Sequence, residues 1–405
     1  MISMMNVVLV DTTLAGPVIG SAQTFLLDLA AGLVELGLGV HVATAGQPER
    51  RIAASLEQTG ASVHTDIWPS PYLVEDIAPG FADWVHDLNP DVYIVSVSPD
   101  IGWAALPHLQ PKIATVAIAH GDSATFFHPM AHYARYLTWA VGVSETVCEH
   151  LRTECGLPAE RVVWIPYGVY PGPNPGLLNA PDPDGALRLI YAGRLTDTQK
   201  RASDVIRIVE RLRPTALNYH VSVVGDGPLK GDFCRDLAPE IAAGRAVMTG
   251  WLSREDLHKE MDQSDVFILT SDSEGFPIGL VEAMAHGLAP VVTDIPSGNR
   301  QLVRHLENGM LAPVGGIDDF VADIQRLDQD RRLLRSLRAA AWQSAQRFTI
   351  QRMLRSYLHC FTNATNAAQA NRRMPDPQFP LMGRCVSRYP LWLRRLKLAV
   401  GRVQM

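Results

Sequence analysis

The first half of the chain alternates short apolar segments with longer segments that have a helical pattern of apolar and polar positions. The apolar segments are rich in β-branched residues, which is typical of strands that are buried on both faces. Their alternation with helices predicts a parallel sheet with crossover helices. The predicted strands are NVVLVD (6–11), GVHVATA (39–45), DVYIVSVS (91–98), IATVAIAH (113–120) and LTWAVGVS (137–144), and the first predicted helix is SAQTFLLDLAAGLVELG (21–37).

The pattern stops at YPGPNPGLLNAPDPDG (170–185), which is too rich in proline and glycine for a helix or a strand. It then starts again with a helix near 201–213 and a helix that Ser253 and Asp256 begin as a capping box. The predicted strands of this half are LRLIYAG (187–193), YHVSVVGDG (219–227), AVMTGW (246–251), SDVFILTS (264–271) and LAPVVTD (288–294).

Two α/β domains with Rossmann-like parallel sheets are therefore expected, facing each other across a cleft. A chain of 405 residues is also longer than one hydrophobic core usually accommodates. The predicted boundaries are 1–169 for an N-terminal domain, 170–186 for a linker, 187–355 for a C-terminal domain and 356–405 for a helical tail. Because ligands of parallel sheets collect beyond the carboxyl ends of the strands, we expect the ligand between the two sheets.

Composition and charge narrow the class of protein. The chain is 47% hydrophobic and 19% charged, as ordinary soluble globular proteins are, and its net charge of −6 offers no broad attraction to nucleic acid. No apolar run reaches the length of about 18 residues that a transmembrane helix needs, and MISMMNVVLVDTT does not read as a secretory signal. The five cysteines include no C-x-x-C pair, so we expect reduced thiols in a cytoplasmic protein.

The loop between the first predicted strand and helix contains Gly16 and Gly20 in AGPVIGSAQ. Glycines there let backbone N–H groups approach an anion at the start of the helix. A tight turn that only connects strand and helix would look the same. The loop is not G-x-G-x-x-G, and VVGDGPLKG misses that spacing by one residue, which argues against a dinucleotide oxidoreductase.

Two basic residues, Arg194 and Lys200, lie between a predicted strand and a predicted helix. A guanidinium fork and an ammonium group at that place suit a diphosphate. The alternative is a solvated basic loop.

Two glutamates, Glu274 and Glu282, frame a third candidate site in SEGFPIGLVEAMAHGLAPVVTD (273–294). Eight helical residues advance about 12 Å, whereas the carboxylate pairs of glycosidases lie about 5 to 9.5 Å apart. The two glutamates suit opposite ends of an extended ligand that has hydroxyl groups at both ends and a phosphate between them. A sugar joined through a diphosphate to a ribose is such a ligand.

In their order, these motifs resemble family four of the retaining nucleotide-sugar glycosyltransferases, which has the GT-B fold and an E-x7-E signature. EGFPIGLVEAMAHG (274–287) is similar to that signature. The likeness extends to about residue 345. It includes the first glycine loop, VGVSETVCEHLRTECGLPAERVVWIPYGV (141–169), AGRLTDTQKRASDVI (192–206), VVGDGPL (223–229), TGWLSREDL (249–257) and SGNRQLVRHLENGMLAPVGG (297–316).

The resemblance implies that residues 1–169 form the acceptor domain and residues 187–355 the donor domain. It also implies a role for each residue that matches the family's motifs. Glu282 would hold the ribose hydroxyls, Glu274 would lie near the hydroxyls of the transferred sugar, and Arg194 and Lys200 would neutralise the diphosphate. His120 would lie close to the donor sugar and the acceptor. The remaining donor contacts implied are Gly16, Gly20, Gly225, Gly250, Trp251, Leu252, Gly275, Phe276 and Ile278, with the base near Gly250 to Leu252.

The chain departs from the broad family pattern at three places. Arg201 stands where many members have glycine, Pro277 removes one N–H group from the loop after Glu274, and the first loop lacks an adjacent glycine pair. These differences bear on how the loops contact the sugar and on the contact expected of Gly16. They do not change the class of protein that the resemblance implies.

The implied mechanism needs neither a metal nor another cofactor. Negative charge collects on the leaving diphosphate, and prepositioned cations stabilise that charge in the transition state. The catalytic residues are then His120, Arg194, Lys200 and Glu274, with Asp122 as a possible orienting partner of His120; a structural histidine is the alternative. The one D-x-D, Asp182 to Asp184, lies in the linker and reads as a solvated turn.

The end of the chain is basic and amphipathic. Trp392, Leu393, Leu396, Val400 and Val403 share one helical face, and no acidic residue follows Asp376. This face suits either the inner surface of a membrane or the N-terminal domain.

We therefore expect a retaining hexosyltransferase that uses a nucleotide-diphosphate sugar and a hydroxyl acceptor, which a lipid could carry, in surface polysaccharide or glycolipid synthesis. Glycosylation of a secondary metabolite and a sugar-nucleotide epimerase with the GT-B fold stay open. A phosphorylase would be far longer, and a non-catalytic subunit would have lost parts of the donor site.

Overall fold

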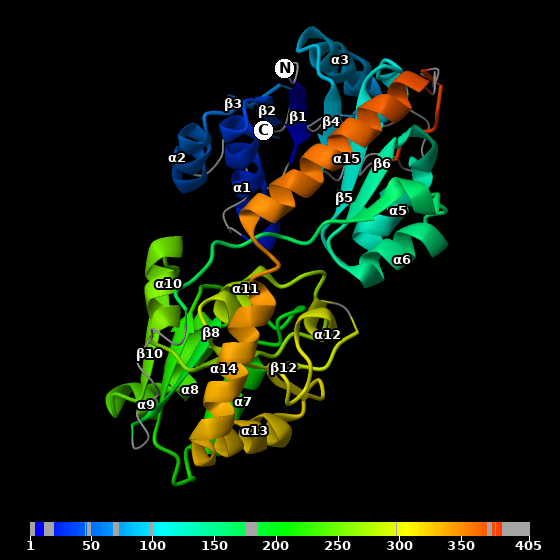
Figure 1. The fold of residues 1–405 in the computed structure, drawn as a ribbon. Coiled ribbons are helices and arrows are strands. Elements are labelled where there is room, and N and C mark those ends of the chain that lie inside the picture. The colour runs from blue at the N-terminus through cyan, green and yellow to red at the C-terminus, as the bar shows by residue number, and fades with distance from the viewer. Residues whose placement is uncertain are drawn as a thin grey trace. The chain divides into compact units, whose positions relative to one another are not determined.

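The computed structural model describes residues 5–11, 20–44, 46, 50–67, 73–97, 100–174, 185–296, 298–370, 375–376 and 378–382, without the side chains of residues 50 and 51. The chain divides into two compact units (Figure 1). Unit 1 comprises Met1–Ile165 and Met353–Met405, and unit 2 comprises Pro166–Arg352.

Unit 1 contains a seven-stranded parallel sheet with the order β3-β2-β1-β4-β5-β6-β7. Its strands are nearly continuous apolar runs, and every residue of β5 is buried, as a sheet covered on both faces requires. The strands are β1 (Asn6–Val10), β2 (Gly39–Ala43), β3 (Ser62–His64), β4 (Val92–Val95), β5 (Ala114–Ala119), β6 (Trp139–Gly142) and β7 (Val162–Trp164).

Helices of unit 1 pack on the sheet. Val8 and Val10 of β1 share one hydrophobic core with residues of α3, α4, α5 and α6. On α1, Gly32 lies against Leu354 of α15, and Phe25 contacts Tyr357 of α15. The helices are α1 (Ser21–Glu35), α2 (Arg50–Thr59), α3 (Val74–Asp87), α4 (Ile101–Ala104), α5 (Ala124–His132), α6 (Glu145–Thr153) and α15 (Ile350–Ala370).

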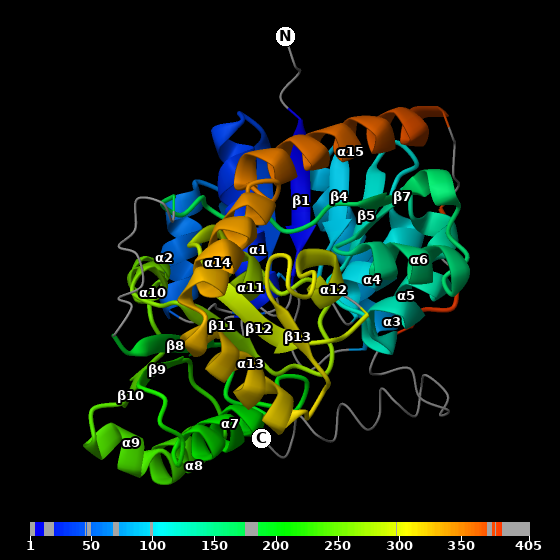
Figure 2. The same ribbon diagram turned by 60° about the horizontal axis from the view of Figure 1, so that its bottom comes forward.

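Unit 2 contains a six-stranded parallel sheet with the order β10-β9-β8-β11-β12-β13 (Figure 2). α7 packs against α13, and α11 packs against α14. The strands are β8 (Leu187–Ala192), β9 (Tyr219–Val224), β10 (Ala246–Gly250), β11 (Val266–Leu269), β12 (Ala289–Thr293) and β13 (Met310–Ala312). The helices are α7 (Ser203–Leu212), α8 (Lys230–Asp236), α9 (Ala238–Ala242), α10 (Arg254–Asp262), α11 (Ile278–Ala285), α12 (Gly298–Leu302), α13 (Ile317–Gln329) and α14 (Arg331–Ala345).

The predicted fold class, two Rossmann-like parallel sheets in an α/β protein, is confirmed. The N-cap of α10 at Ser253 is also confirmed, because Ser253 Oγ accepts a hydrogen bond from the N–H of Asp256 at 3.1 Å. The Asp256 carboxylate accepts from the Ser253 hydroxyl at 2.7 Å. The hydrophobic pattern did not predict β3, β7 and β13. Each has three residues, which is too short for a hydrophobic pattern to be distinctive.

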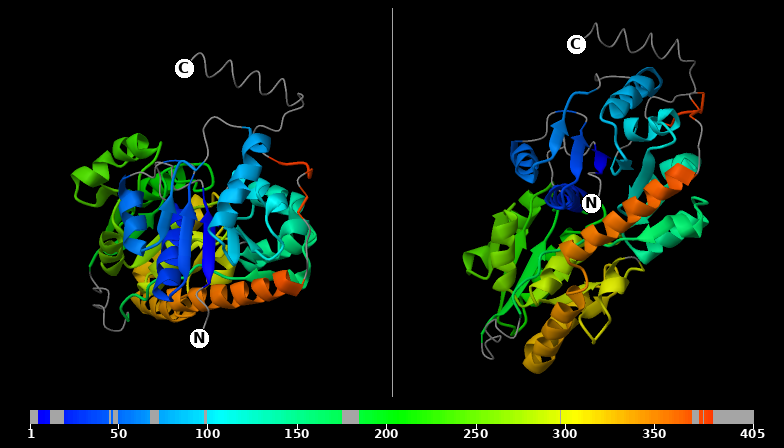
Figure 3. Two further views of the ribbon diagram at one scale, coloured as in Figure 1. Left: turned by 90° about the horizontal axis from the view of Figure 1, so that it is seen from above. Right: turned by 45° about the horizontal axis from the view of Figure 1, so that its top comes forward.

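The C-terminal part of the chain returns to unit 1. α15 begins in unit 2 and runs along unit 1 from Met353 onward (Figure 3). Beyond it, Phe379 packs against the rings of Tyr133 and Tyr136, and the N–H of Met382 donates to Tyr133 Oη at 2.6 Å. The amphipathic segment with Trp392 and residues 175–184 of the predicted linker lie outside the described residues.

Each sheet reverses its strand order at one point, between β1 and β4 in unit 1 and between β8 and β11 in unit 2. Loops that leave neighbouring strands there diverge to opposite sides of the sheet, which leaves room for a ligand at the carboxyl edge. The loops after β8 and β11 carry Arg194, Lys200 and Glu274.

Candidate active site

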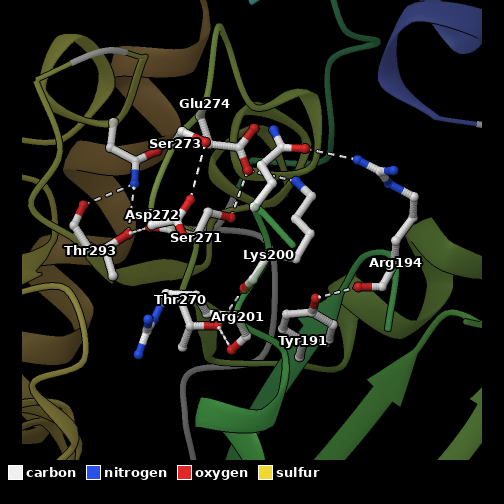
Figure 4. Close-up of polar contacts among 12 residues, drawn as sticks. Tyr191, Arg194, Lys200, Arg201, Thr270, Ser271, Asp272, Ser273, Glu274 and Thr293 are labelled. Carbon is white, nitrogen blue, oxygen red and sulfur yellow. Dashed lines mark hydrogen bonds and ion pairs between the residues drawn. The ribbon is translucent and has the colours of Figure 1, made fainter. Parts of the chain in front are cut away.

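The switch point of unit 2 joins two of the predicted site residues in a buried ion pair. Lys200 follows β8, Glu274 follows β11, and Lys200 Nζ lies 2.6 Å from Glu274 Oε1 (Figure 4). The side chain of Lys200 is 13% exposed and that of Glu274 is 6% exposed. Ser271 Oγ donates to the same carboxylate oxygen at 2.6 Å. Glu274 Oε2 has no hydrogen-bond partner among the described residues, so it can still accept bonds from a ligand.

The loop that carries Lys200 has a strained backbone. Gln199 has φ +72° and Arg201 has φ +45°, which are left-handed conformations that residues other than glycine seldom adopt. The hydroxyl of Thr270 lies 3.0 Å from the carbonyl oxygens of both Lys200 and Arg201, and the N–H of Asp272 donates to the Gln199 carbonyl at 3.0 Å. The end of β11 therefore holds this loop in place. Such strain is common at functional sites.

Arg201 shows why this position commonly has glycine. A left-handed φ costs glycine almost no free energy, whereas it strains the backbone of arginine. Its guanidinium Nε donates to Asp204 Oδ2 at 2.8 Å, which partly offsets that cost.

A glutamine, Gln199, links the side chain of Arg194 to the loop that carries Lys200. This glutamine was not among the residues predicted from the sequence. Arg194 Nη2 donates to Gln199 Oε1 at 2.8 Å. Its carbonyl accepts a hydrogen bond from Tyr191 Oη at 2.9 Å. Burial raises the pKa of Tyr191 well above its usual value, with a smaller contribution from Glu274, so its hydroxyl stays protonated and keeps donating. Arg194 is itself exposed, and Gln199 links it to the loop that carries Lys200.

Backbone N–H groups beside Glu274 form the start of α11. Gly275, Phe276 and Ile278 are buried residues, and the N–H groups of all three lack a hydrogen-bond partner within the described part of the chain. Pro277, the N-cap residue, has no N–H group to contribute. Buried unpaired N–H groups are rare in folded proteins, and at the start of a helix they suit an anion.

Glu282 lies on α11, and a histidine of α10 lies close to its carboxylate. His258 Nε2 of α10 is 3.6 Å from Glu282 Oε1. The rings of His258 and His286 are 4.4 Å apart, and His286 Nδ1 is 2.7 Å from Asp262 Oδ1. Burial lowers the pKa of His286, with smaller opposing contributions from Asp262 and Glu282. The ribose contact predicted for Glu282 would therefore form beside two histidines.

The loops after β9 and β10 meet at the same edge of the sheet. The N–H of Gly225 donates to the Gly250 carbonyl at 2.9 Å. Gly225 has φ +141°, and a Cβ atom there would lie 1.9 Å from the Gly193 carbonyl oxygen, so only glycine fits. Trp251 is exposed and Leu252 is half-buried. The residues predicted to contact the base thus lie next to the loop that carries Arg194.

In unit 1, His120 lies at the end of β5 in a buried polar network. Ser96 Oγ is 2.9 Å from His120 Nε2 and 3.0 Å from Asp11 Oδ2, and the rings of Phe25 and Phe126 flank the imidazole. Burial lowers the pKa of His120 to about 3, so the imidazole is neutral near pH 7. His120 can therefore position a hydroxyl group, but it is a poor reservoir of protons.

Asp122 does not orient His120, which corrects the expectation from the sequence. Its carboxylate lies 2.7 Å from His150 Nδ1 of α6 instead. Ser96, which follows β4, is the partner of His120 because β4 and β5 are neighbouring strands.

The first glycine loop is only partly described. Gly20 is the N-cap residue of α1, and its N–H donates to Gln23 Oε1 at 2.8 Å. A phosphate at Gly20 would have to replace that bond. Gly16 and the D-x-D at Asp182 lie outside the described residues.

The described residues offer neither a metal site nor a membrane span. No group of three or more histidine, cysteine, aspartate or glutamate side chains in this part of the chain is arranged to hold a metal ion. In the same residues, no helix has the length and apolar character needed to cross a bilayer.

Two domain families match the chain. Residues 22–172 match the family described as Glycosyltransferase Family 4, and residues 186–330 match Glycosyl transferases group 1. A solved structure of Anabaena Alr3699/HepE in complex with UDP and glucose has a TM-score of 0.70 at 18% identity, covering 88% of this chain and 99% of that one. The fold is therefore the GT-B fold, and both matched domain families are glycosyltransferase families. The chain thus carries a domain of each of these two glycosyltransferase families, and its E-x7-E motif lies in the group 1 domain.

Bacterial relatives share parts of the sequence. A lipopolysaccharide 1,6-galactosyltransferase of Salmonella typhimurium is 28% identical over 200 residues, which cover 47% of this chain and 53% of the relative. The amylovoran biosynthesis glycosyltransferase AmsK of Erwinia amylovora is 30% identical over 188 residues, 45% of each chain. The chain thus spans about half the length of these two relatives.

Proposed function

We propose that this protein transfers a hexosyl unit from a nucleotide-diphosphate sugar to a hydroxyl acceptor, with retention of configuration, in the synthesis of a surface polysaccharide or glycolipid. One observation carries the proposal. The Lys200–Glu274 ion pair lies beside the unpaired N–H groups of Gly275, Phe276 and Ile278, at the switch point of a doubly wound sheet. Cations, N–H donors and a carboxylate in one place suit a diphosphate joined to a sugar.

The chemistry follows from the charge that develops when the anomeric C–O bond breaks. That charge collects on the leaving diphosphate, where Arg194, Lys200 and the N–H groups at the start of α11 would stabilise it. Glu274 Oε2 would accept a hydrogen bond from a hydroxyl of the transferred sugar, and Glu282 would accept hydrogen bonds from the ribose. We propose attack on the same face of the sugar, assisted by the leaving phosphate, without a metal or a covalent glycosyl-enzyme.

Support for the acceptor class and the donor base comes from the comparisons. The names of the Salmonella and Erwinia relatives refer to lipopolysaccharide and amylovoran, and the Anabaena structure contains UDP and glucose. UDP-hexoses are therefore the first donors to test.

Peripheral contact of the basic C-terminal segment with the inner face of the membrane stays a prediction. Co-sedimentation of full-length and 380-truncated protein with anionic liposomes tests that contact, and equal recovery would contradict it.

The donor is best identified by a thermal-shift panel of UDP-, GDP-, ADP- and dTDP-sugars, because a ligand that binds only the folded state raises the melting temperature. We expect one nucleotide class to stabilise the protein. Proton NMR of the product formed with a lipid-linked or oligosaccharide acceptor should then show the donor's anomeric configuration. Stabilisation by no sugar nucleotide would contradict the proposal. Isomerisation of the donor without an acceptor would indicate the epimerase instead.

A further inference from the structure

The two oxygens of the Glu274 carboxylate have different surroundings. Oε1 accepts hydrogen bonds from Lys200 Nζ and Ser271 Oγ, both at 2.6 Å, whereas Oε2 has no partner in the described part of unit 2. Both donors therefore hold the same oxygen and leave the other for a ligand. In Figure 4 the two donors approach the carboxylate from different elements, Lys200 from the loop after β8 and Ser271 from the end of β11.

Hydrogen bonds from a neighbouring strand and helix hold the backbone of Ser271 in place. Its carbonyl accepts a short hydrogen bond from the hydroxyl of Thr293, the last residue of β12. Asn299 Nδ2 of α12 donates to the Thr293 carbonyl at 2.9 Å and lies 3.3 Å from Thr293 Oγ1. All three side chains are fully buried. The Ser271 hydroxyl is thus a donor fixed by a chain of buried contacts.

Lys200, in contrast, is a donor that can change partners. It carries a long side chain on a loop flanked by the left-handed residues Gln199 and Arg201. An ammonium group is a point charge on a flexible stem, and a diphosphate carries more negative charge than one carboxylate. A bound diphosphate therefore competes with Glu274 for Lys200.

We propose that Ser271 is a positioning residue that keeps Glu274 Oε2 directed at the donor sugar when Lys200 turns toward the diphosphate. The inference rests on the proposed function and deepens it. Before the donor binds, Lys200 neutralises Glu274. After the donor binds, Oε1 keeps the hydrogen bond from the Ser271 hydroxyl. Ser271 touches neither sugar nor phosphate in this arrangement, so its effect passes through Glu274.

The test compares a nucleotide with and without its sugar. Isothermal titration measures the Kd of UDP and of UDP-glucose or UDP-galactose, whichever stabilises the wild type more. We expect Ser271→Ala to weaken UDP-hexose binding about tenfold, the effect of losing a hydrogen bond to a charged group, and to leave the Kd of UDP within about twofold. Retained UDP binding also shows that the variant is folded.

Two further variants separate positioning from packing. Ser264→Ala removes another buried serine hydroxyl of unit 2, which donates to the Glu260 carbonyl at 2.8 Å, and it should change neither Kd. Ser271→Thr keeps the hydroxyl and should bring UDP-hexose affinity back toward that of the wild type.

The outcomes also distinguish this inference from the proposed function. Suppose that the wild type binds UDP-hexose, and that Ser271→Ala either weakens the binding of UDP and of UDP-hexose equally or changes neither Kd. Ser271 is then a packing residue, and only the inference is overturned. If the wild type binds no sugar nucleotide of the four classes, the proposed function fails and the inference fails with it. A selective loss with UDP-hexose, rescued by threonine, supports both.

Discussion

Two buried ion pairs lie at opposite edges of the unit 2 sheet. Lys200 and Glu274 pair at 2.6 Å beyond the carboxyl ends of β8 and β11. Arg338 of α14 and Asp265, which precedes β11, pair at 2.7 Å at the amino edge. Their side chains are similarly buried, at 13% and 6% exposed for the first pair and 6% and 10% for the second. Distance and burial alone do not distinguish them.

The surroundings of the two pairs differ. Asp265 Oδ2 also accepts the N–H of Arg188 at 3.0 Å, and Arg338 Nε donates to the Gly287 carbonyl at 2.7 Å, so both carboxylate oxygens are satisfied. At the carboxyl edge, Glu274 Oε2 and the N–H groups of Gly275 and Phe276 have no partner within the described residues. A completed network holds elements together, whereas unused hydrogen-bonding capacity beside a strained loop indicates a ligand.

The largest effect should come from breaking the completed pair. Arg338→Met keeps much of the side-chain volume but leaves the Asp265 carboxylate buried without its cation, which should lower the free energy of unfolding by about 3–5 kcal/mol. Urea denaturation measures this loss. Asp265→Asn combined with Arg338→Met removes the unpaired charge and should recover part of the stability. A loss below about 1 kcal/mol in the single variant would place this pair among ordinary surface ion pairs.

The next effect concerns turnover rather than stability. Arg194→Ala or Lys200→Ala removes a donor from the diphosphate, which typically costs about 2.7–4 kcal/mol of transition-state stabilisation. We expect turnover at saturating donor to fall about a hundredfold or more in both variants, and Arg194→Ala, which leaves no buried carboxylate without its cation, to lose less stability than Arg338→Met. Steady-state kinetics and urea denaturation of the same preparations test this split. Near-normal turnover in both variants would remove the two residues from the mechanism.

A smaller effect should come from the support of the Lys200 loop. Thr270→Val deletes the hydroxyl near the carbonyls of Lys200 and Arg201 and should cost about 1–3 kcal/mol, because these groups lose a donor. If this loop serves the ligand, the Kd of the donor should rise in addition. Thr215→Val, which removes a hydroxyl bonded to the Leu212 carbonyl, is the matched control and should leave that Kd unchanged. Equal donor affinity in both variants would make Thr270 purely structural.

The smallest effect is expected at the strained arginine. Arg201→Gly relieves the left-handed φ but loses the contact with Asp204 and adds chain entropy to the unfolded state. We expect these contributions to cancel within about 1 kcal/mol and turnover to stay within about threefold. Thermal denaturation and initial rates measure both. A much larger loss of turnover would mean that the guanidinium itself contacts the donor.

The sequence by itself determined the fold class and most of the elements. Runs such as IATVAIAH and LAPVVTD predict buried strands, because residues covered on both faces must all be apolar. The order and spacing of motifs along most of the chain, from the first glycine loop to SGNRQLVRHLENGMLAPVGG, were enough to suggest the family. Strands of three residues, such as β3, β7 and β13, carry too little pattern to be recognised.

Only the tertiary structure decided which of these residues are partners. Lys200 and Glu274 are 74 positions apart, and they meet because β8 and β11 are neighbours across the point where the strand order reverses. For the same reason His120 bonds with Ser96, 24 positions away, and not with the nearby Asp122. Local patterns are set by side chains a few residues apart, whereas hydrogen-bond partners are set by strand order, which no local pattern contains.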